Sequence, residues 1–148
     1  MALPSFTGVG RLTEDPQLRF SSAGIAVASI SLAFNARRFD KDRQEWVDGD
    51  VCFIRGTAYR GLAENAAETL TRGMEVVVSG RLKTEQWEDR DGEKRSRVAL
   101  IVESIGPNLA WATAKVARVD RSHAGGADTP RAGVEDPWAG GGGEEPPF

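Results

Sequence analysis

The chain has 148 residues, of which 40% are hydrophobic and 28% charged, a composition that predicts one folded domain with an additional segment. Its single cysteine excludes an internal disulfide, and its single histidine leaves no Cys/His cluster for zinc. It contains neither a secretory signal nor an apolar stretch long enough to cross a bilayer, so we expect a cytoplasmic protein.

The net charge of −3 is distributed unevenly along the chain. Residues 122–148 carry one arginine against five carboxylates, a net charge of −4, which leaves +1 for residues 1–121. The body of the chain is therefore nearly neutral. Any attraction to a polyanion must come from where individual cations are placed rather than from the total.

The first third of the chain reads as extended structure. Phe6–Leu12 and Leu18–Phe20 are short strands separated by a turn signal at Thr13–Gln17. After a hairpin loop at Ser21–Gly24, Ile25–Asn35 alternates apolar with small polar side chains, which predicts a strand with one buried face.

Ala36–Asp50 is dense in charge and shows no periodicity, which predicts a long, mobile hairpin loop. It contains two isolated aromatic residues. Phe39, close to Arg37 and Arg38, is interpreted as part of a finger that contacts a partner, with packing back onto the domain as the alternative. For Trp46 we favour packing back.

The strand Val51–Tyr59 has two chemically different faces. Its inward face is small or apolar: Cys52, Ile54, Gly56 and Ala58. Its outward face is a ring, a cation, a hydroxyl and a ring: Phe53, Arg55, Thr57 and Tyr59. The two rings leave room for bases to stack, with Arg55 between them to meet a phosphate or lie over a base. Cys52 is expected to be a small core residue.

Gly61–Arg72 is the one convincing helix, with a narrow apolar stripe and a stop signal at Gly73. The stripe predicts packing against one end of a barrel and no chemistry. The next segment, Met74–Trp87, is a long strand whose core face is Val76, Val78, Gly80 and Leu82. Its other face becomes charged and ends in Trp87, which suits a partner with π-faces and negative charge. The alternative is a solvated face with a tryptophan that caps the core.

Asp91-Gly92 predicts a hairpin turn into a last barrel strand, Lys94–Ile105, with Val98, Leu100 and Val102 inward. Gly106-Pro107 ends it. The side-chain pattern of Leu109–Val119 fits either a further strand or a short helix. We favour an extra strand at the edge of a subunit.

Residues 122–148 contain seven glycines and four prolines without apolar periodicity, which predicts a disordered tail. It ends in two acids, two prolines and a ring: Glu144, Glu145, Pro146, Pro147 and Phe148. This tip suits a recognition peptide, with an inert acidic tail as the alternative. We therefore expect a domain at 1–121 and a partner-binding tail at 122–148.

Five strands with a helix between the third and the fourth is the order of an oligonucleotide-binding barrel, the OB-fold. Several stretches also resemble the bacterial single-stranded DNA-binding protein family: VGRL and LRF near the start, LTRG at the end of the helix, VSGRL in the central strand, and the terminal EEPPF. The resemblance covers residues 5–106 and the last few residues.

The resemblance implies that the protein binds single-stranded DNA during replication, recombination and repair, in association with the nucleoid. It implies base stacking on four rings: Phe39, Phe53, Tyr59 and Trp87. Phosphate contacts would come from five cations: Arg19, Arg37, Arg38, Arg55 and Lys83. It further implies a homotetramer, and a tip that recruits replication and repair enzymes.

Three other function classes fit the residues less well. An enzyme is not expected, because the sole histidine, His123, lies in the tail and no nucleophile elbow or phosphate-cradling loop occurs. We expect no catalytic, cofactor-binding or metal site. A protein-interaction barrel that acts through its tail would not need exposed rings beside cations, and a sequence-specific RNA binder would need a set of side chains for base-edge readout.

Overall fold

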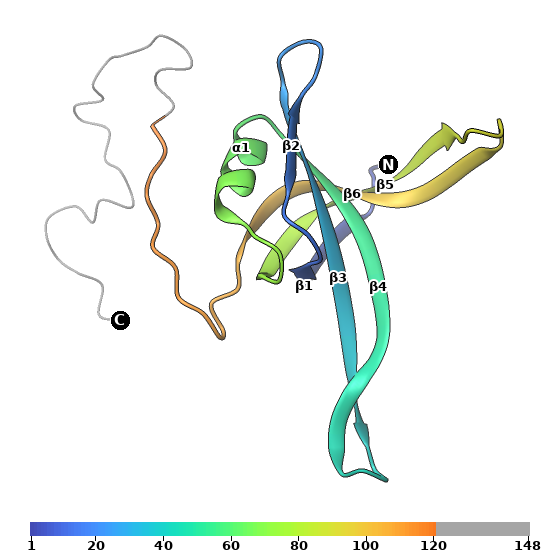
Figure 1. Ribbon diagram of the computed structural model, residues 1–148, viewed down its shortest axis with the longest axis vertical. Helices are drawn as coiled ribbons and strands as arrows, with labels where there is room; N and C mark the ends of the chain where they lie inside the picture. The colour runs from blue at the N-terminus through green and yellow to red at the C-terminus, as the bar shows by residue number, and fades with distance from the viewer. Residues whose placement is uncertain (121–148) are drawn as a thin grey trace, which may run out of the picture. The chain divides into compact units, whose positions relative to one another are not determined.

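The computed structural model describes residues 1–120. Over this range the chain forms six strands and one helix, labelled in Figure 1: β1 (Ser5–Leu12), β2 (Gln17–Phe20), β3 (Ala26–Asp40), β4 (Glu45–Tyr59), α1 (Arg60–Thr69), β5 (Glu75–Glu88) and β6 (Lys94–Pro107). Residues 1–114 make one compact unit. In the described range no helix is long and apolar enough to span a membrane.

The strands form one sheet in the order β1-β5-β6-β4-β3-β2, which an additional β1–β3 pairing closes into a barrel. β4 and β6 pair in parallel, with Gly56 opposite Leu100 and Thr57 opposite Ile101. The other pairings are antiparallel, and β2 extends the sheet along β3. Five barrel strands with α1 between β4 and β5 confirm the predicted OB-fold.

The core follows the predicted alternation. In β3 every second residue from Ala26 to Leu32 is buried, and in β5 so are Val76, Val78 and Gly80. Ala63 and Ala66 of α1 pack into the same cluster, which confirms the helix stripe. α1 ends at Thr69, three residues earlier than predicted, because Leu70 leaves the helix in an extended conformation and enters the core.

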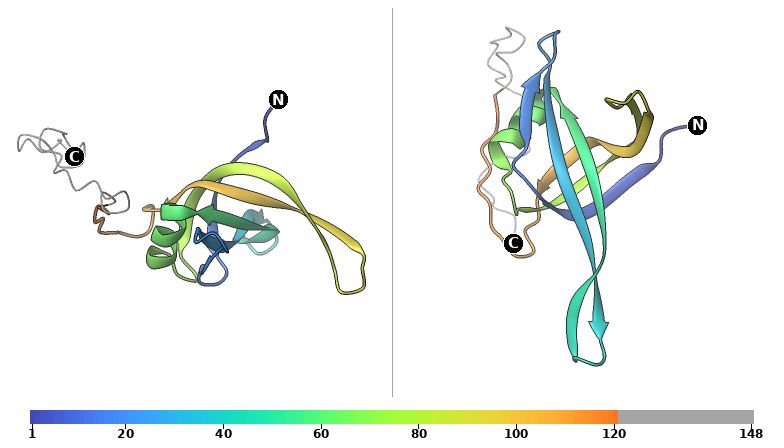
Figure 2. Two further views of the ribbon diagram at one scale, coloured as in Figure 1. Left: turned by 90° about the horizontal axis from the view of Figure 1, so that it is seen from above. Right: turned by 45° about the vertical axis from the view of Figure 1, so that its right-hand side comes forward.

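Two hairpins extend beyond the barrel in different directions (Figures 1 and 2). The first corrects the prediction of a mobile loop at Ala36–Asp50: β3 and β4 continue through it, with Phe39 opposite Trp46, as far as a turn at 41–44. A register shift between Asn35 and Arg37 interrupts the alternation. Outside the barrel neither face of this hairpin is covered, so its sequence carries no apolar period.

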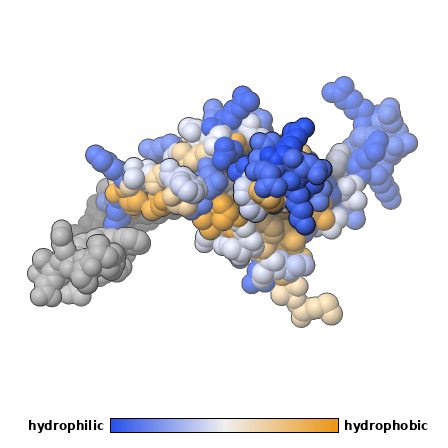
Figure 3. Space-filling view, turned by 90° about the horizontal axis from the view of Figure 1, so that it is seen from below, coloured by the Kyte–Doolittle hydropathy of each residue, from blue (hydrophilic) through white to orange (hydrophobic). Residues whose placement is uncertain are grey.

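The second hairpin joins β5 and β6 and confirms the Asp91-Gly92 turn. The Asp89 carboxylate accepts backbone N–H bonds from Asp91 and Glu93 at 2.9 Å, and Gly92 has a φ of 78°. The side chain of Arg95, followed by these backbone donors, holds the pKa of Asp89 below its ordinary value. Figure 3 shows hydrophilic residues gathered at the ends of both hairpins.

Two further expectations are wrong. Cys52 is exposed, because β4 at this point has left the barrel. Val98 is 56% exposed for the same reason on β6, whereas Leu100 and Val102 are buried as predicted. Leu109–Val119 forms neither a strand nor a helix in the single chain described, so its pairing at the edge of a subunit stays a prediction.

Candidate nucleic-acid interface

The outer face of β2, β3 and β4 carries polar side chains in cross-strand rows. β2 and β3 align Gln17 with Ser29, and β4 continues this row with Thr57. The rows on either side of this one bring Arg19 and Arg55 to one hollow of about 200 Å³. Its walls come from five strands: Gln17, Arg19, Val27, Ser29, Arg55, Thr57, Glu85 and Arg97. Two predicted phosphate-binding cations therefore lie on one surface.

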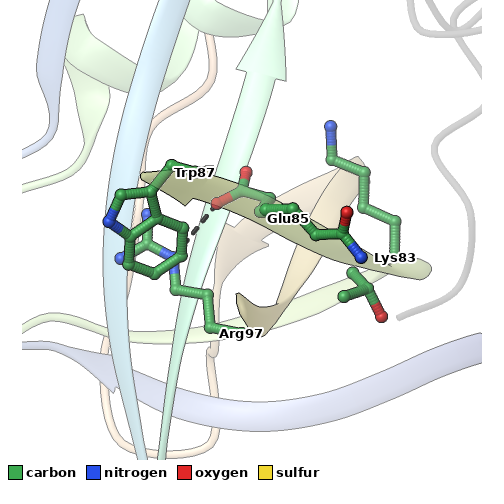
Figure 4. A pocket seen from close by; sticks show the side chains of 6 residues that line it. Lys83, Glu85, Trp87 and Arg97 are labelled. Carbon is green, nitrogen blue, oxygen red and sulfur yellow. Dashed lines mark hydrogen bonds and ion pairs between the residues drawn. The ribbon is translucent and has the colours of Figure 1, made fainter. Parts of the chain in front are cut away.

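A second, more open hollow of about 650 Å³ lies on the β5–β6 hairpin (Figure 4). Its lining is Lys83, Thr84, Glu85, Gln86, Trp87 and Arg97. Because Glu85 and Arg97 also line the first hollow, the two hollows are adjacent and share a border. The structure thus joins Arg19, Arg55, Lys83 and Trp87 along one continuous surface.

The border between the hollows is an ion pair beside a ring. Arg97 Nε lies 3.1 Å from Glu85 Oε2, on directly opposed residues of β6 and β5. The Arg97 guanidinium carbon is 5.1 Å from the centroid of the Trp87 ring, a cation–π distance. Figure 4 shows the three side chains together. Arg97 was not among the predicted site residues: a two-residue turn at Asp91-Gly92 would pair it with Gln86, whereas the observed register pairs it with Glu85.

The predicted stacking rings fall into two groups. Phe53 is 71% exposed and Tyr59 and Trp87 are each about 40% exposed, on strands that border the hollows. Phe39 lies on the β3–β4 hairpin, where its ring meets Trp46 edge-on at 5.6 Å. Trp46 is itself 61% exposed, so the expectation that it packs back onto the domain is wrong.

The predicted phosphate ligands differ from several other cations in their ion pairing. Within residues 1–120, five form ion pairs with carboxylates: Arg11, Arg43, Arg81, Arg95 and Arg97. The five predicted phosphate ligands form none there: Arg19, Arg37, Arg38, Arg55 and Lys83. A cation that has no carboxylate partner can contact a phosphate without first breaking an ion pair.

Two other expectations concern a metal site and the recognition tip at the end of the chain. Among residues 1–120 no group of three His, Cys, Asp or Glu side chains is arranged to hold a metal ion. The predicted recognition tip, Glu144–Phe148, lies outside the described residues.

The model of the single-strand binding protein family matches residues 4–107. The chain belongs to this family. This membership covers the whole barrel and both hairpins, and therefore all nine of the predicted rings and cations.

Relatives in the family are similar over most of their length. A single-stranded DNA-binding protein of Mycobacterium bovis is 45% identical, over 97% of this chain and 97% of the relative. One from Mycolicibacterium smegmatis is 50% identical over 80% of this chain and 72% of the relative. The crystal structure of a small single-stranded DNA-binding protein from Streptomyces coelicolor superposes with a TM-score of 0.64 at 34% identity, covering 74% of this chain and 98% of that one.

Proposed function

We propose that the protein binds single-stranded DNA along the surface that joins the two hollows. The observation that carries this proposal is the combination of exposed rings (Phe53, Tyr59 and Trp87) with cations that have no carboxylate partner among residues 1–120. Each ring can stack one base, and the neighbouring cations can meet the phosphates between the bases. Family membership and the names of the relatives support the same function.

Binding of this kind has little sequence preference, because every base offers a π-face. The surface contributes rings and cations rather than a set of amides and carboxylates directed at base edges. The nearly neutral body of the chain limits the number of phosphate contacts, so we expect affinity to fall with salt on a modest slope. The role is binding and protection of the strand during replication, recombination and repair, without catalysis.

A fluorescence titration with a mixed-sequence oligonucleotide tests this function. Stacking on Trp87 should quench tryptophan emission in proportion to saturation, and duplex DNA of the same sequence should compete poorly. No quenching, together with no retention on immobilised single strands, would refute the proposal and favour a barrel that binds only proteins.

We propose further that the protein assembles as a homotetramer. Support comes from the apolar segment that follows β6, where Leu109, Trp111 and Val116 are 61%, 91% and 88% exposed in the single chain. Large apolar side chains that are this exposed are suited to contact with another subunit. Removal of residues 107–148 should lower the assembly mass or the melting temperature relative to removal of residues 122–148 alone. An unchanged mass and melting temperature would refute a role of this segment in assembly.

The terminal residues Glu144–Phe148 are proposed to recruit replication and repair enzymes. Acids, a stiff proline pair and a ring beside a free carboxylate suit a pocket with an apolar floor and a basic rim. Deletion of these five residues should abolish capture of such enzymes and leave DNA affinity unchanged, or slightly higher at low salt. Capture of the same enzymes by the truncated protein would contradict this proposal.

A further inference from the structure

One carboxylate lies among the four cations, the ring and the neutral side chains that line the two hollows. Of the residues that border them, Glu85 is the single acid, and it lies between the cations of the β2–β4 face and those of the β5–β6 hairpin. A phosphate backbone that crosses from one hollow to the other passes this carboxylate. The residue therefore opposes the ligand at the centre of the proposed path.

The cation that neutralises Glu85 is held loosely enough to exchange. The side chains of Arg97 and Glu85 are 43% and 27% exposed, and ion pairs so accessible to water contribute little to stability. The Arg97 guanidinium also lies 5.1 Å from the Trp87 ring centroid. Contact with the ring can keep the guanidinium in place while its anionic partner changes.

We propose that Arg97 is a further DNA-binding residue and that Glu85 is its built-in competitor: a phosphate of the bound strand displaces the Glu85 carboxylate from Arg97. This inference rests on the proposed single-strand binding. A phosphate oxygen would accept the bond that Arg97 Nε now donates to Glu85 Oε2 at 3.1 Å. The freed Glu85 would then lie beside a phosphate, which lowers affinity.

The exchange predicts the salt dependence of binding. A cation that meets a phosphate releases about 0.7 of a counterion from a single strand. When Arg97 leaves Glu85, the carboxylate attracts a cation in its place, which cancels most of that release. Removing the carboxylate should therefore make binding both tighter and more sensitive to salt.

The test is Glu85→Gln in the full-length protein, with Kd for a thymidine oligonucleotide measured at several salt concentrations. We expect binding several-fold tighter at low salt and a log–log slope steeper by up to ~0.7. The matched control is Glu103→Gln, which removes the same charge and breaks the 3.7 Å pair with Arg81 on the same two strands, outside both hollows. The control should change affinity and slope much less.

A second substitution separates exchange from general repulsion. Adding Arg97→Gln to Glu85→Gln should reverse the gain, because the gain depends on the freed guanidinium. The inference is overturned if Glu85→Gln binds no tighter than wild type, if Glu103→Gln matches it, or if the gain persists without Arg97. Failure of the wild type to bind the oligonucleotide at all would instead refute the proposed function. Circular dichroism melts establish that each variant is folded.

Discussion

The two hairpins that leave the barrel use similar strands for different surfaces. On the β5–β6 hairpin some cations face carboxylates across the hairpin: Arg97 pairs with Glu85 and Arg95 with Asp89. On the β3–β4 hairpin, Arg37 and Arg38 have no ion pair within residues 1–120. The first hairpin presents a pre-arranged ring and cation, and the second presents free charge. We infer that the first contributes mainly stacking and the second mainly attraction to phosphate.

The largest expected effect concerns how each hairpin is rooted in the barrel. Both roots contain a register shift and a glycine nearby, but a Cβ at Gly80 would collide with the Ile101 carbonyl, whereas one at Gly49 would make an ordinary contact at 3.4 Å with the Ala36 carbonyl oxygen. Gly80→Ala should destabilise the protein by about 1–3 kcal/mol or more, because backbone must shift to admit the methyl group. Gly49→Ala should cost much less. Urea unfolding of both variants measures the difference, and equal losses would contradict it.

The rings provide the next largest contrast. Trp87→Ala and Phe53→Ala should each weaken single-strand binding by about 1–3 kcal/mol without unfolding the barrel. Phe39→Ala should cost less, since Trp46 stays exposed beside the vacated position. Binding isotherms at one salt concentration compare the three variants. Wild-type affinity in a folded Trp87 or Phe53 variant would remove that ring from the site.

The charges on the β3–β4 hairpin should affect how steeply DNA affinity falls with salt concentration, rather than the stacking of bases on the rings. Arg38→Gln is expected to reduce the log–log salt slope by about 0.7 if that arginine meets one phosphate. Arg43→Gln is the matched control on the same hairpin, because Arg43 is already 3.9 Å from Glu45. Titrations at several salt concentrations measure both slopes. An unchanged slope in the Arg38 variant would exclude a phosphate contact by this residue.

The smallest effect is local to the β5–β6 turn and depends on pH. Asp89 has a folded-state pKa below its ordinary value of 3.8. Its contribution to the turn is therefore present above pH 3.8 and is lost as the pH falls through the lowered pKa. Asp89→Asn should speed exchange of the Asp91 and Glu93 amide protons at neutral pH, and the difference from wild type should fade in acid. A pH-independent difference would assign the turn to other contacts.

The barrel could be predicted from the sequence because each of its strands has one covered face. In Ile25–Asn35 and in Met74–Trp87 apolar side chains recur at every second residue because one face of the strand is buried. The structure confirms both core faces, except that Phe34 and Leu82 are only partly buried. The Asp91-Gly92 turn was equally readable, since glycine supplies the positive φ that the turn needs.

The β3–β4 hairpin could not be predicted in the same way. Its turn places Gln44, rather than a glycine, at a φ of 55°, and the register shift after Asn35 breaks any period of two. Cys52 and Val98 are exposed for a similar reason: each lies on the inward face of its strand, but beyond the end of the barrel, where nothing covers that face. Arg97 was missed because its significance lies in the residue opposite, which depends on strand register rather than on composition.

The parallel seam between β4 and β6 has a consequence for how the protein folds. The seam joins Gly56 to Leu100 and Thr57 to Ile101, residues more than forty positions apart, whereas each hairpin pairs near neighbours. Contacts between residues so far apart in the sequence form slowly, because closing the large loop between them costs conformational entropy before the contacts can stabilise the chain. We expect the hairpins to form early and the seam to close late. Arg55 and Arg97 face a common hollow across that seam, so this hollow forms later in folding than the hollow that lies on the β5–β6 hairpin alone.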